Sequence, residues 1–328
     1  MILKGTNIKK YFPIKKGVFL QTAGHVKALE QVDFELNEHE TLGVVGESGC
    51  GKTTLGRVIT LLYSATSGHL EYTSPDQRTR FINKRMNKHQ LKLYRRDMQM
   101  VFQDPFSSLD PRMTIGDILR EPLDTHQIFL NRRERDDYIE YLLGRVGMYP
   151  EYSVRYPHEF SGGQRQRISI ARAIALKPRA IVCDEPTSAL DVSVQSQIIN
   201  LLQELKEQER MAYFFISHDL DLVYHISDRI MVMYLGSVME EGSADEVFNH
   251  ATHPYTRVLM KSIPHWDPKK RKLRTVHLEG EPPSPINPPK GCPFNTRCPN
   301  AFDRCVNQMP QLKRLNDHHS VACWLYDD

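Results

Sequence analysis

A glycine-rich segment near residue 50 carries the residue types that bind a chain of phosphates. Four residues separate its first and last glycines, and Lys and Thr follow directly: Gly46, Glu47, Ser48, Gly49, Cys50, Gly51, Lys52, Thr53 and Thr54. The glycines let the backbone curl so that successive N–H groups face the phosphates. In loops of this pattern the Lys reaches the β- and γ-phosphates and the Thr hydroxyl binds Mg²⁺. We therefore expect residues 46–54 to bind a nucleoside triphosphate, with Lys52 on its phosphates and Thr53 on Mg²⁺.

Two adjacent carboxylates, Asp184 and Glu185, follow the apolar run 180–183. A strand that ends in a carboxylate beside a phosphate-binding loop supplies a further contact to Mg²⁺, which predicts this role for Asp184. Glu185 would then polarise a water molecule for attack on the γ-phosphate. The chemistry expected of the pair is hydrolysis of the triphosphate.

Two further polar residues follow apolar runs of their own. Gln103 comes directly after Val101 and Phe102, and His218 comes just after the run 212–216. We expect Gln103 to contact the metal or the attacking water, and His218 to contact the γ-phosphate. Taken alone, each of these residues would more often have a structural role.

The elements that must position these residues follow from hydrophobic spacing. The runs 41–45, 180–183 and 212–216 are short and apolar, as in buried parallel strands, and residues 32–36 alternate as in a half-buried strand. A helix after the phosphate loop should bury one face, and a second should begin at Asp191 or Ser193 as its cap. These faces comprise Leu55, Val58, Ile59 and Leu62, and Val194, Ile198, Leu201, Leu202 and Leu205. Strands alternating with helices predict an α/β fold with a parallel sheet. The first 35 or so residues read as short strands and turns.

Composition sets limits on the class of protein. The 328 residues carry a net charge of +3 at pH 7, and their mean hydropathy is −0.48. The sequence shows neither an apolar run of membrane-spanning length nor a secretory signal pattern, so we expect a soluble protein that stays inside the cell. A basic run at 269–274 is interpreted as a solvated linker, with a patch for phosphates or anionic lipid as the alternative.

One segment, Ser161-Gly162-Gly163-Gln164, resembles the signature motif of ATP-binding cassette (ABC) proteins, and the motifs follow the order found there. Asp191 lies in a stretch that resembles their D-loop. The resemblance implies a RecA-like core, an N-terminal antiparallel β subdomain and a helical subdomain at about 104–165. It also implies that ATP is held between the phosphate loop of one chain and residues 161–164 of another, with an aromatic ring, Phe12, stacked on adenine.

Several further segments resemble the ATP-binding subunits of dipeptide and oligopeptide importers. They are residues 101–112, 253–256, the proline-rich strap 281–289 and the N-terminal segment 9–19. The resemblance implies a cassette at 1–250 and a C-terminal extension at 251–328. It also implies a second, different ATP-binding subunit, two transmembrane permease subunits and a periplasmic binding protein, at the cytoplasmic face of the inner membrane. The alternatives are a soluble ABC ATPase that acts on nucleic acid or ribosomes, and a degenerate cassette that binds ATP without turnover. A single phosphate loop and the absence of sustained heptads argue against the first, and we expect no nucleic-acid partner.

Four cysteines, Cys292, Cys298, Cys305 and Cys323, gather near the end of the chain. Disulfides are disfavoured inside the cell, and four thiolates can bind a [4Fe–4S] cluster or a zinc ion. The spacing is looser than that of most zinc sites, and the importer resemblance implies the [4Fe–4S] cluster. Zinc and a metal-free segment remain as alternatives.

Overall fold

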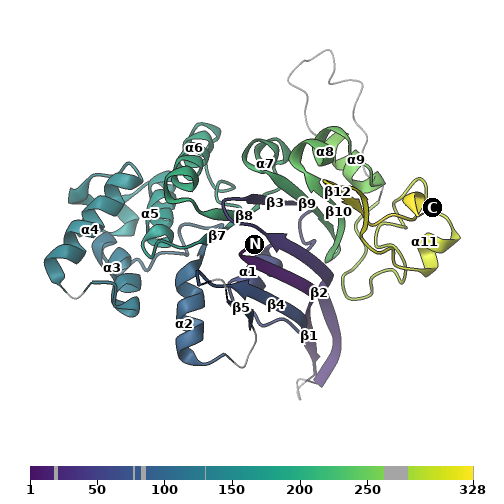
Figure 1. Ribbon diagram of the computed structural model, residues 1–328, viewed down its shortest axis with the longest axis horizontal. Coiled ribbons are helices and arrows are strands. Elements are labelled where there is room, and N and C mark those ends of the chain that lie inside the picture. The colour runs from purple at the N-terminus through teal and green to yellow at the C-terminus, as the bar shows by residue number, and fades with distance from the viewer. Residues whose placement is uncertain (18–20, 77, 83–85, 130, 262–279, 328) are drawn as a thin grey trace, which may run out of the picture.

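The computed structural model describes residues 1–17, 21–76, 78–82, 86–129, 131–261 and 280–327. Two β-sheets form the centre, and helices lie on both faces of the larger one (Figure 1). Among the residues described, no helix combines the length and the apolar character that a membrane span requires. The basic run predicted as a linker at 269–274 lies outside the described residues.

The larger sheet has eight strands in the order β11-β12-β10-β9-β3-β8-β7-β6. Strands β9, β3, β8, β7 and β6 run parallel, whereas β10, β12 and β11 are antiparallel to their neighbours. The predicted parallel sheet is therefore the core of a mixed sheet. The strands are β3 (Thr41–Val45), β6 (Met98–Val101), β7 (Ala180–Asp184), β8 (Ala212–Ile216), β9 (Arg229–Tyr234), β10 (Ser237–Ser243), β11 (Lys313–Asn316) and β12 (His319–Val321).

The smaller, antiparallel sheet has the order β2-β1-β4-β5. Its strands are β1 (Leu3–Lys16), β2 (Gln21–Leu36), β4 (Ser67–Thr73) and β5 (Thr79–Ile82). The prediction of short strands and turns before residue 35 was wrong, because β1 and β2 form one long hairpin. Its register shifts several times, and Asn7 and Gln31 have positive φ angles of 51° and 57°. Such irregularities break the alternation that marks a strand in the sequence without ending the pairing.

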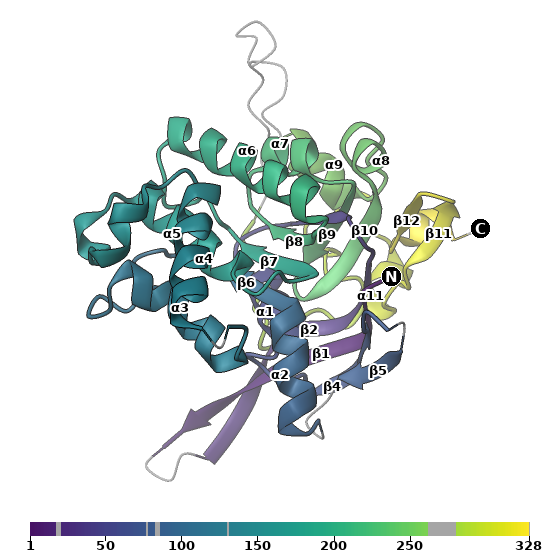
Figure 2. The ribbon, with the colours of Figure 1, turned by 60° about the vertical axis from the view of Figure 1, so that its left-hand side comes forward.

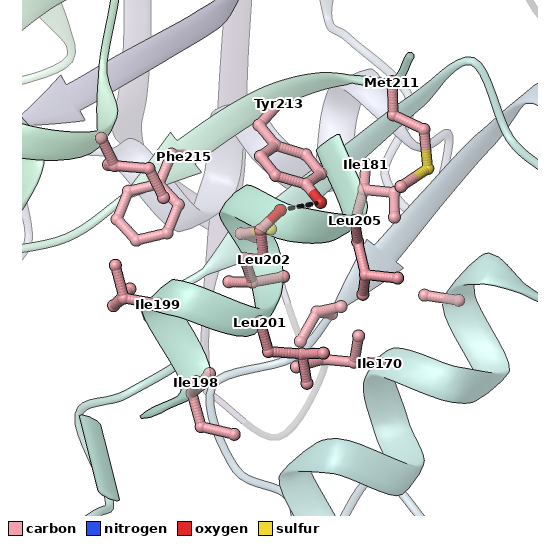
Figure 3. Close-up of a cluster of buried hydrophobic side chains, with 14 of the residues drawn as sticks. Ile170, Ile181, Ile198, Ile199, Leu201, Leu202, Leu205, Met211, Tyr213 and Phe215 are labelled. Carbon is pink, nitrogen blue, oxygen red and sulfur yellow. Dashed lines mark hydrogen bonds between the residues drawn. The ribbon is translucent and has the colours of Figure 1, made fainter. Parts of the chain in front are cut away.

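Helices cover both faces of the larger sheet. Helix α1 (Lys52–Ile59) lies between the two sheets, and α6 (Val192–Glu209), α7 (Leu220–Ile226), α8 (Ala244–Asn249) and α9 (Pro254–Lys261) lie on the opposite face (Figure 2). On α6 the predicted apolar face is buried against β7 and β8 except for Val194, which is only partly buried. The Tyr213 hydroxyl donates a 2.8 Å hydrogen bond to the Leu202 carbonyl (Figure 3). Leu62, assigned from spacing to the buried face of α1, lies beyond the end of the helix and is exposed.

A helical unit projects from the edge of the larger sheet that ends in β7 and β6 (Figure 2). It contains α3 (Ile115–His126), α4 (Arg132–Arg145), the 3₁₀ turns η1 (Pro150–Val154) and η2 (Pro157–Glu159), and α5 (Gly162–Ile174), and α2 (Lys88–Asp97) precedes β6. Helices α3 and α4 fall within the predicted range of about 104–165, whereas α5 continues past it and packs on β6 and α6. This packing joins the unit to the core.

The C-terminal segment, residues 280–327, has no sheet of its own. Residues 281–289 form neither helix nor strand, as their prolines predict, and α11 (Asp303–Asn307) and η3 (Trp324–Tyr326) are short. Strands β11 and β12 instead extend the larger sheet, because β12 pairs with β10. The segment is therefore attached to the core by main-chain hydrogen bonds.

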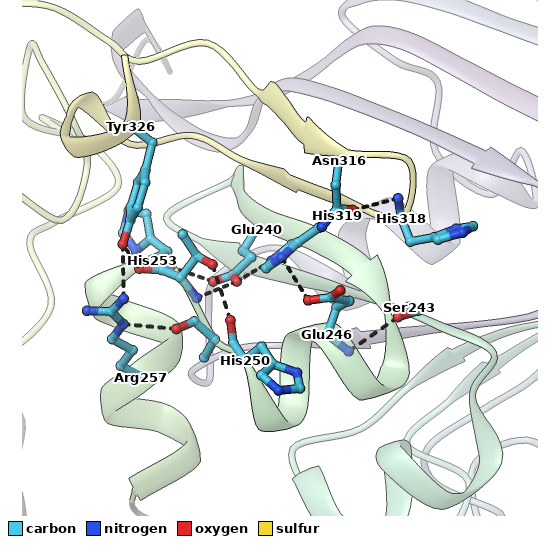
Figure 4. Close-up of polar contacts among 12 residues, drawn as sticks. Glu240, Ser243, Glu246, His250, His253, Arg257, Asn316, His318, His319 and Tyr326 are labelled. Atoms are coloured by element: carbon cyan, nitrogen blue, oxygen red, sulfur yellow. Dashed lines mark hydrogen bonds and ion pairs between the residues drawn. The ribbon is translucent and has the colours of Figure 1, made fainter. Parts of the chain in front are cut away.

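A buried glutamate, Glu240 on β10, reinforces this attachment (Figure 4). Its carboxylate accepts hydrogen bonds from the backbone N–H groups of Thr252 and His253 at 2.7 and 2.8 Å. It also pairs with His319 Nε2 on β12 at 2.6 Å. The hydrogen bond to Glu240 raises the pKa of His319, whereas burial lowers the pKa of His253 to about 4. One carboxylate thus connects β10, the start of α9 and β12.

Candidate functional site

The predicted phosphate loop lies between β3 and α1, with its glycines in conformations that other residues rarely adopt. Gly46 and Gly51 have φ angles of 148° and 108°. A Cβ atom on Gly46 would lie 2.1 Å from the Met233 carbonyl oxygen, and one on Gly51 would lie 2.4 Å from that of Ala28. The loop leads directly into the N-terminus of α1, where free backbone N–H groups favour an anion.

Lys52 is buried at the start of α1. Its ammonium group donates hydrogen bonds to the carbonyl oxygens of Gly46 at 2.7 Å and Glu47 at 3.1 Å, and lies 3.8 Å from Cys50 Sγ. Burial raises the pKa of the Cys50 thiol. Backbone carbonyl groups of the loop therefore hold the Lys52 ammonium beneath the loop.

Two of the three predicted magnesium contacts, Thr53 and Asp184, touch each other, whereas Gln103 is bonded to Glu185. Thr53 Oγ1 donates a 2.8 Å hydrogen bond to Asp184 Oδ1. Burial raises the pKa of Asp184, and the hydrogen bond from Thr53 acts in the opposite direction. A hydroxyl and a carboxylate are the hard oxygen donors that Mg²⁺ prefers, so the donor set fits this ion.

Glu185 lies at the centre of the other predicted residues. Its Oε2 atom accepts a 2.9 Å hydrogen bond from Gln103 Nε2 and lies 3.2 Å from His218 Nδ1. The residue has a positive φ of 46°, a conformation that a non-glycine residue adopts at a free-energy cost. Its backbone N–H is fixed by the Ile216 carbonyl at 2.9 Å, which aims the side chain toward the end of β8. The structure thus brings together the three residues predicted to be catalytic.

A pocket of about 220 Å³ opens over the phosphate loop. It is lined by Val26, Ala28, Ser48, Gly49, Gly51, Lys52, Thr53, Thr54, Gln103, Glu185 and Pro285. Phe12, the predicted adenine-stacking ring, does not line this pocket. It is the cross-strand partner of Val26 and packs edge-on against Tyr63 with ring centroids 5.4 Å apart. The Lys10 ammonium lies 4.8 Å from the centre of its ring.

The segment Ser161-Gly162-Gly163-Gln164 begins α5, away from this pocket. Ser161 is the N-cap of α5, and its hydroxyl accepts a 3.4 Å hydrogen bond from the Gln164 N–H while the Gln164 side chain accepts one of 3.0 Å in return. None of these four residues lines the pocket over the phosphate loop. The two groups of predicted nucleotide-binding residues therefore lie apart within one chain.

Asp191 occupies the N-cap position of α6, as predicted, but its side chain makes no capping hydrogen bond. The prediction that the Asp191 side chain caps α6 with a hydrogen bond was therefore wrong. Asp191 is exposed, and the adjacent Val192 retains 79% of its surface. This exposed turn follows the 185–190 segment that carries the predicted catalytic glutamate.

The four C-terminal cysteines are all free thiols. Burial raises the pKa of Cys292 to about 12, and the nearby Cys323, Cys305 and Cys298 thiols add to the increase. The donor chemistry fits a sulfur-ligated metal. However, the described residues contain no group of three or more His, Cys, Asp or Glu side chains that could hold a metal ion. The structure therefore does not support the predicted metal site, and the [4Fe–4S] cluster stays a prediction.

Three residues close to the phosphate loop were not identified from the sequence as site residues. Pro285 lines the pocket, Tyr255 accepts a 2.9 Å hydrogen bond from the Glu47 N–H, and Arg297 forms an ion pair with the Glu47 carboxylate at 2.8 Å. All three come from beyond residue 250. Tyr255 belongs to a stretch that was singled out only for its resemblance to the importers, and no sequence signal relates Pro285 or Arg297 to the loop.

Family models and individual relatives identify this chain with one family. Residues 29–188 match the ABC transporter family, and residues 239–305 match the oligopeptide/dipeptide transporter C-terminal region. The chain is 50% identical to the oligopeptide transport ATP-binding protein AppF of Bacillus subtilis, over 99% of this chain and 97% of that protein. It is 48% identical to OppF of Escherichia coli, over 100% and 97%, and 47% identical to the di/tripeptide transport protein DppF of Pseudomonas aeruginosa, over 98% and 97%.

Solved structures agree on the fold. The dimeric structure of a post-hydrolysis state of the ATP-binding cassette MJ0796 bound to ADP and Pi matches with a TM-score of 0.63 at 27% identity, covering 74% of this chain and 99% of that one. The predicted resemblance is confirmed, and the relatives favour a transport ATPase over an ATPase that acts on nucleic acid. The chain belongs to the ABC transporter family, among its oligopeptide and dipeptide transport ATP-binding proteins.

Proposed function

We propose that this chain is the ATP-binding and ATP-hydrolysing subunit of an ABC importer for dipeptides, oligopeptides or a related small solute. The observation that carries the proposal is the convergence of Gln103 and His218 on Glu185, next to the phosphate loop that holds Lys52. A protein that bound ATP without turnover would not need this arrangement.

Each residue has a defined part in hydrolysis. Lys52 and the loop N–H groups bind the β- and γ-phosphates, and Thr53 and Asp184 would hold Mg²⁺ with Gln103 nearby. When bound there, Mg²⁺ would supply positive charge to neutralise the charge that develops on the phosphates. Glu185 accepts a proton from the attacking water, and His218 holds the Glu185 carboxylate and faces the γ-phosphate. Catalysis is then mainly positioning and charge stabilisation.

A second ATP-binding subunit would complete the site, and we propose that it is a different, homologous chain. Support comes from the separation of residues 161–164 from the phosphate-loop pocket within one chain. Ser161, Gly162 and Gly163 form a helix N-terminus, which can bind the γ-phosphate held by the partner. Asp191 and the exposed Val192 would lie at the same junction. Phe12 would stack on adenine beside Val26.

The transmembrane partners are two permease subunits, which receive peptide from a periplasmic binding protein. A hollow of about 550 Å³ beside Gln103 supports their docking, since it joins the phosphate site to the helical unit. Phe102, Asp104 and Arg172 are among its lining residues. The chain would therefore lie peripherally on the cytoplasmic face of the inner membrane, with its cassette at 1–250 and its C-terminal extension at 251–328.

The proposed function is tested by uptake of a labelled peptide into membrane vesicles that contain the assembled transporter. We expect uptake to require both ATP and this chain, because the cassette closure would drive the permease between its two states. Co-purification with hydrophobic membrane subunits is expected in the same preparation. Uptake that continues without this chain, or co-purification with RNA in place of membrane subunits, contradicts the proposal.

We also propose that the four C-terminal thiols hold a [4Fe–4S] cluster, with zinc as the competing metal. The gathering of four free thiols in one short C-terminal segment supports the proposal. The assembled transporter purified without oxygen should show a broad absorbance band near ~400 nm from sulfur–iron charge transfer. Cys50 and Cys183 are outside this group, so Cys183→Ala should keep the band. A colourless preparation that contains no iron contradicts the assignment.

A further inference from the structure

The C-terminal segment contacts the phosphate loop at Glu47, a loop residue that does not line the pocket. The Arg297 guanidinium forms two parallel hydrogen bonds with the Glu47 carboxylate, at 2.8 Å and 3.1 Å. The Arg297 side chain retains only 5% of its surface, and that of Glu47 retains 23%. The two residues are 250 positions apart in the sequence. A bidentate, largely buried pair of this kind fixes both side chains in one geometry.

The Glu47 backbone is held on the same side. Its N–H donates a 2.9 Å hydrogen bond to the Tyr255 hydroxyl, and Arg297 donates one of 3.2 Å to the Tyr234 hydroxyl. The rings of Tyr234, Tyr255 and Phe294 pack with their centroids 4.7 to 5.4 Å apart. Phe294 belongs to the C-terminal segment and is fully buried. The aromatic rings thus form a rigid support under the loop.

A second contact of the C-terminal segment lies at the lining of the pocket. The Lys27 backbone N–H donates a 3.0 Å hydrogen bond to the Pro285 carbonyl oxygen, which places the proline strap against β2. Pro285 then lines the pocket together with Val26 and Ala28. The C-terminal segment therefore borders the proposed nucleotide site on two sides.

Charge explains why the pair with Arg297 matters. Glu47 places a carboxylate inside a loop that must accept a triphosphate. At so short a distance the negative carboxylate and the negative phosphates repel each other. Arg297 neutralises this carboxylate and directs it away from the pocket, which Glu47 does not line. The Glu47 carbonyl oxygen also accepts a 3.1 Å hydrogen bond from Lys52. Displacement of Glu47 would therefore also weaken the contact that Lys52 makes with bound ATP.

We propose that the C-terminal segment is a structural part of the nucleotide site of its own chain, with Arg297 as a positioning residue that holds the phosphate loop through Glu47. The inference rests on the proposed function, since it assigns ATP to this loop. It goes beyond that function by giving the C-terminal segment a role in ATP affinity.

The test measures ATP affinity and turnover in the assembled transporter that carries Arg297→Gln. We expect the Kd and KM for ATP to rise about tenfold, which corresponds to one lost charge-assisted contact, while kcat at saturating ATP changes less than twofold. Arg297→Lys keeps the charge and loses the planar fork, so its Kd should lie between those of the wild type and Arg297→Gln. In the double variant with Glu47→Gln, the Kd should fall back toward the wild-type value because the unpaired carboxylate is gone.

The matched control is Arg314→Gln, since Arg314 is an exposed arginine of the same segment that pairs with Asp317 at 2.9 Å. Its Kd for ATP should stay within about twofold of the wild type. An unchanged Kd in both Arg297 variants overturns the inference and leaves the proposed function intact. If Arg297→Gln does not fold, Arg297→Lys decides alone, because it preserves the buried charge. Absence of ATP binding by the wild type would instead refute the proposed function.

Discussion

Replacing Glu185 with glutamine is expected to abolish ATP hydrolysis while ATP still binds. Glutamine has nearly the same shape and can keep one hydrogen bond with Gln103, but it cannot accept a proton from water. A missing general base typically lowers kcat by a factor of about 10² to 10⁴. Because ATP is then held without turnover, the pair of cassettes should remain closed. Phosphate release and the size of the complex in the presence of ATP measure the two effects.

Glu207→Gln is the matched control for this variant. Glu207 is exposed on α6 and far along the chain from the phosphate loop, so the same change of charge should leave phosphate release unaltered. Hydrolysis by Glu185→Gln at the wild-type rate would refute the assignment of Glu185. Loss of ATP binding in that variant would show that the carboxylate supports the phosphate loop and not the attacking water.

Replacing Lys52 with alanine should have an equally large effect, on binding as well as on turnover. The ammonium is buried beneath the loop, and among the described residues Lys52 is the one lysine or arginine that lines the pocket over the phosphate loop. Its removal leaves the γ-phosphate charge uncompensated, so kcat/KM for ATP should fall about a hundredfold or more. Peptide uptake by the assembled transporter should fall with it.

Lys88→Ala controls for the loss of a lysine, because Lys88 is exposed at the start of α2. Its ATP turnover and peptide uptake should match those of the wild type. If the transporter that carries Lys52→Ala still moves peptide at full rate, this chain does not supply the energy for transport. The proposed function would then fail as a whole.

The parts of the fold that the sequence predicts are those determined by local hydrophobic spacing. The runs at β3 and β8 are short and apolar because both faces of each strand are covered, and their predicted bounds agree with the structure. The hairpin of β1 and β2 was missed because its bulges interrupt the alternation. The antiparallel edge was missed because β11 and β12 have only four and three residues. Such short strands depend on their partners and not on their own pattern.

The candidate site also contains residues that local sequence predicts and residues that it does not. Asp184 ends a parallel strand, and Gln103 and His218 come just after two others. The carboxyl ends of parallel strands meet at one edge of the sheet, so the sequence predicts the proximity of these residues to Lys52. Arg297 cannot be found in this manner, because its partner is 250 positions away and any arginine could form the pair. Asp191 was placed at the correct helix start, but a cap position does not determine where its side chain points.

The pairing of β12 with β10 also bears on how the chain matures during synthesis. Glu240 and His319 are 79 residues apart, so β10 leaves the ribosome long before the strand that completes its edge. Until β12 arrives, the outer main-chain groups of β10 have no neighbour, and the Glu240 carboxylate lacks its histidine. An open edge of this kind can pair with other nascent chains. The cassette therefore reaches its protected form only when a strand made 79 residues later docks on β10.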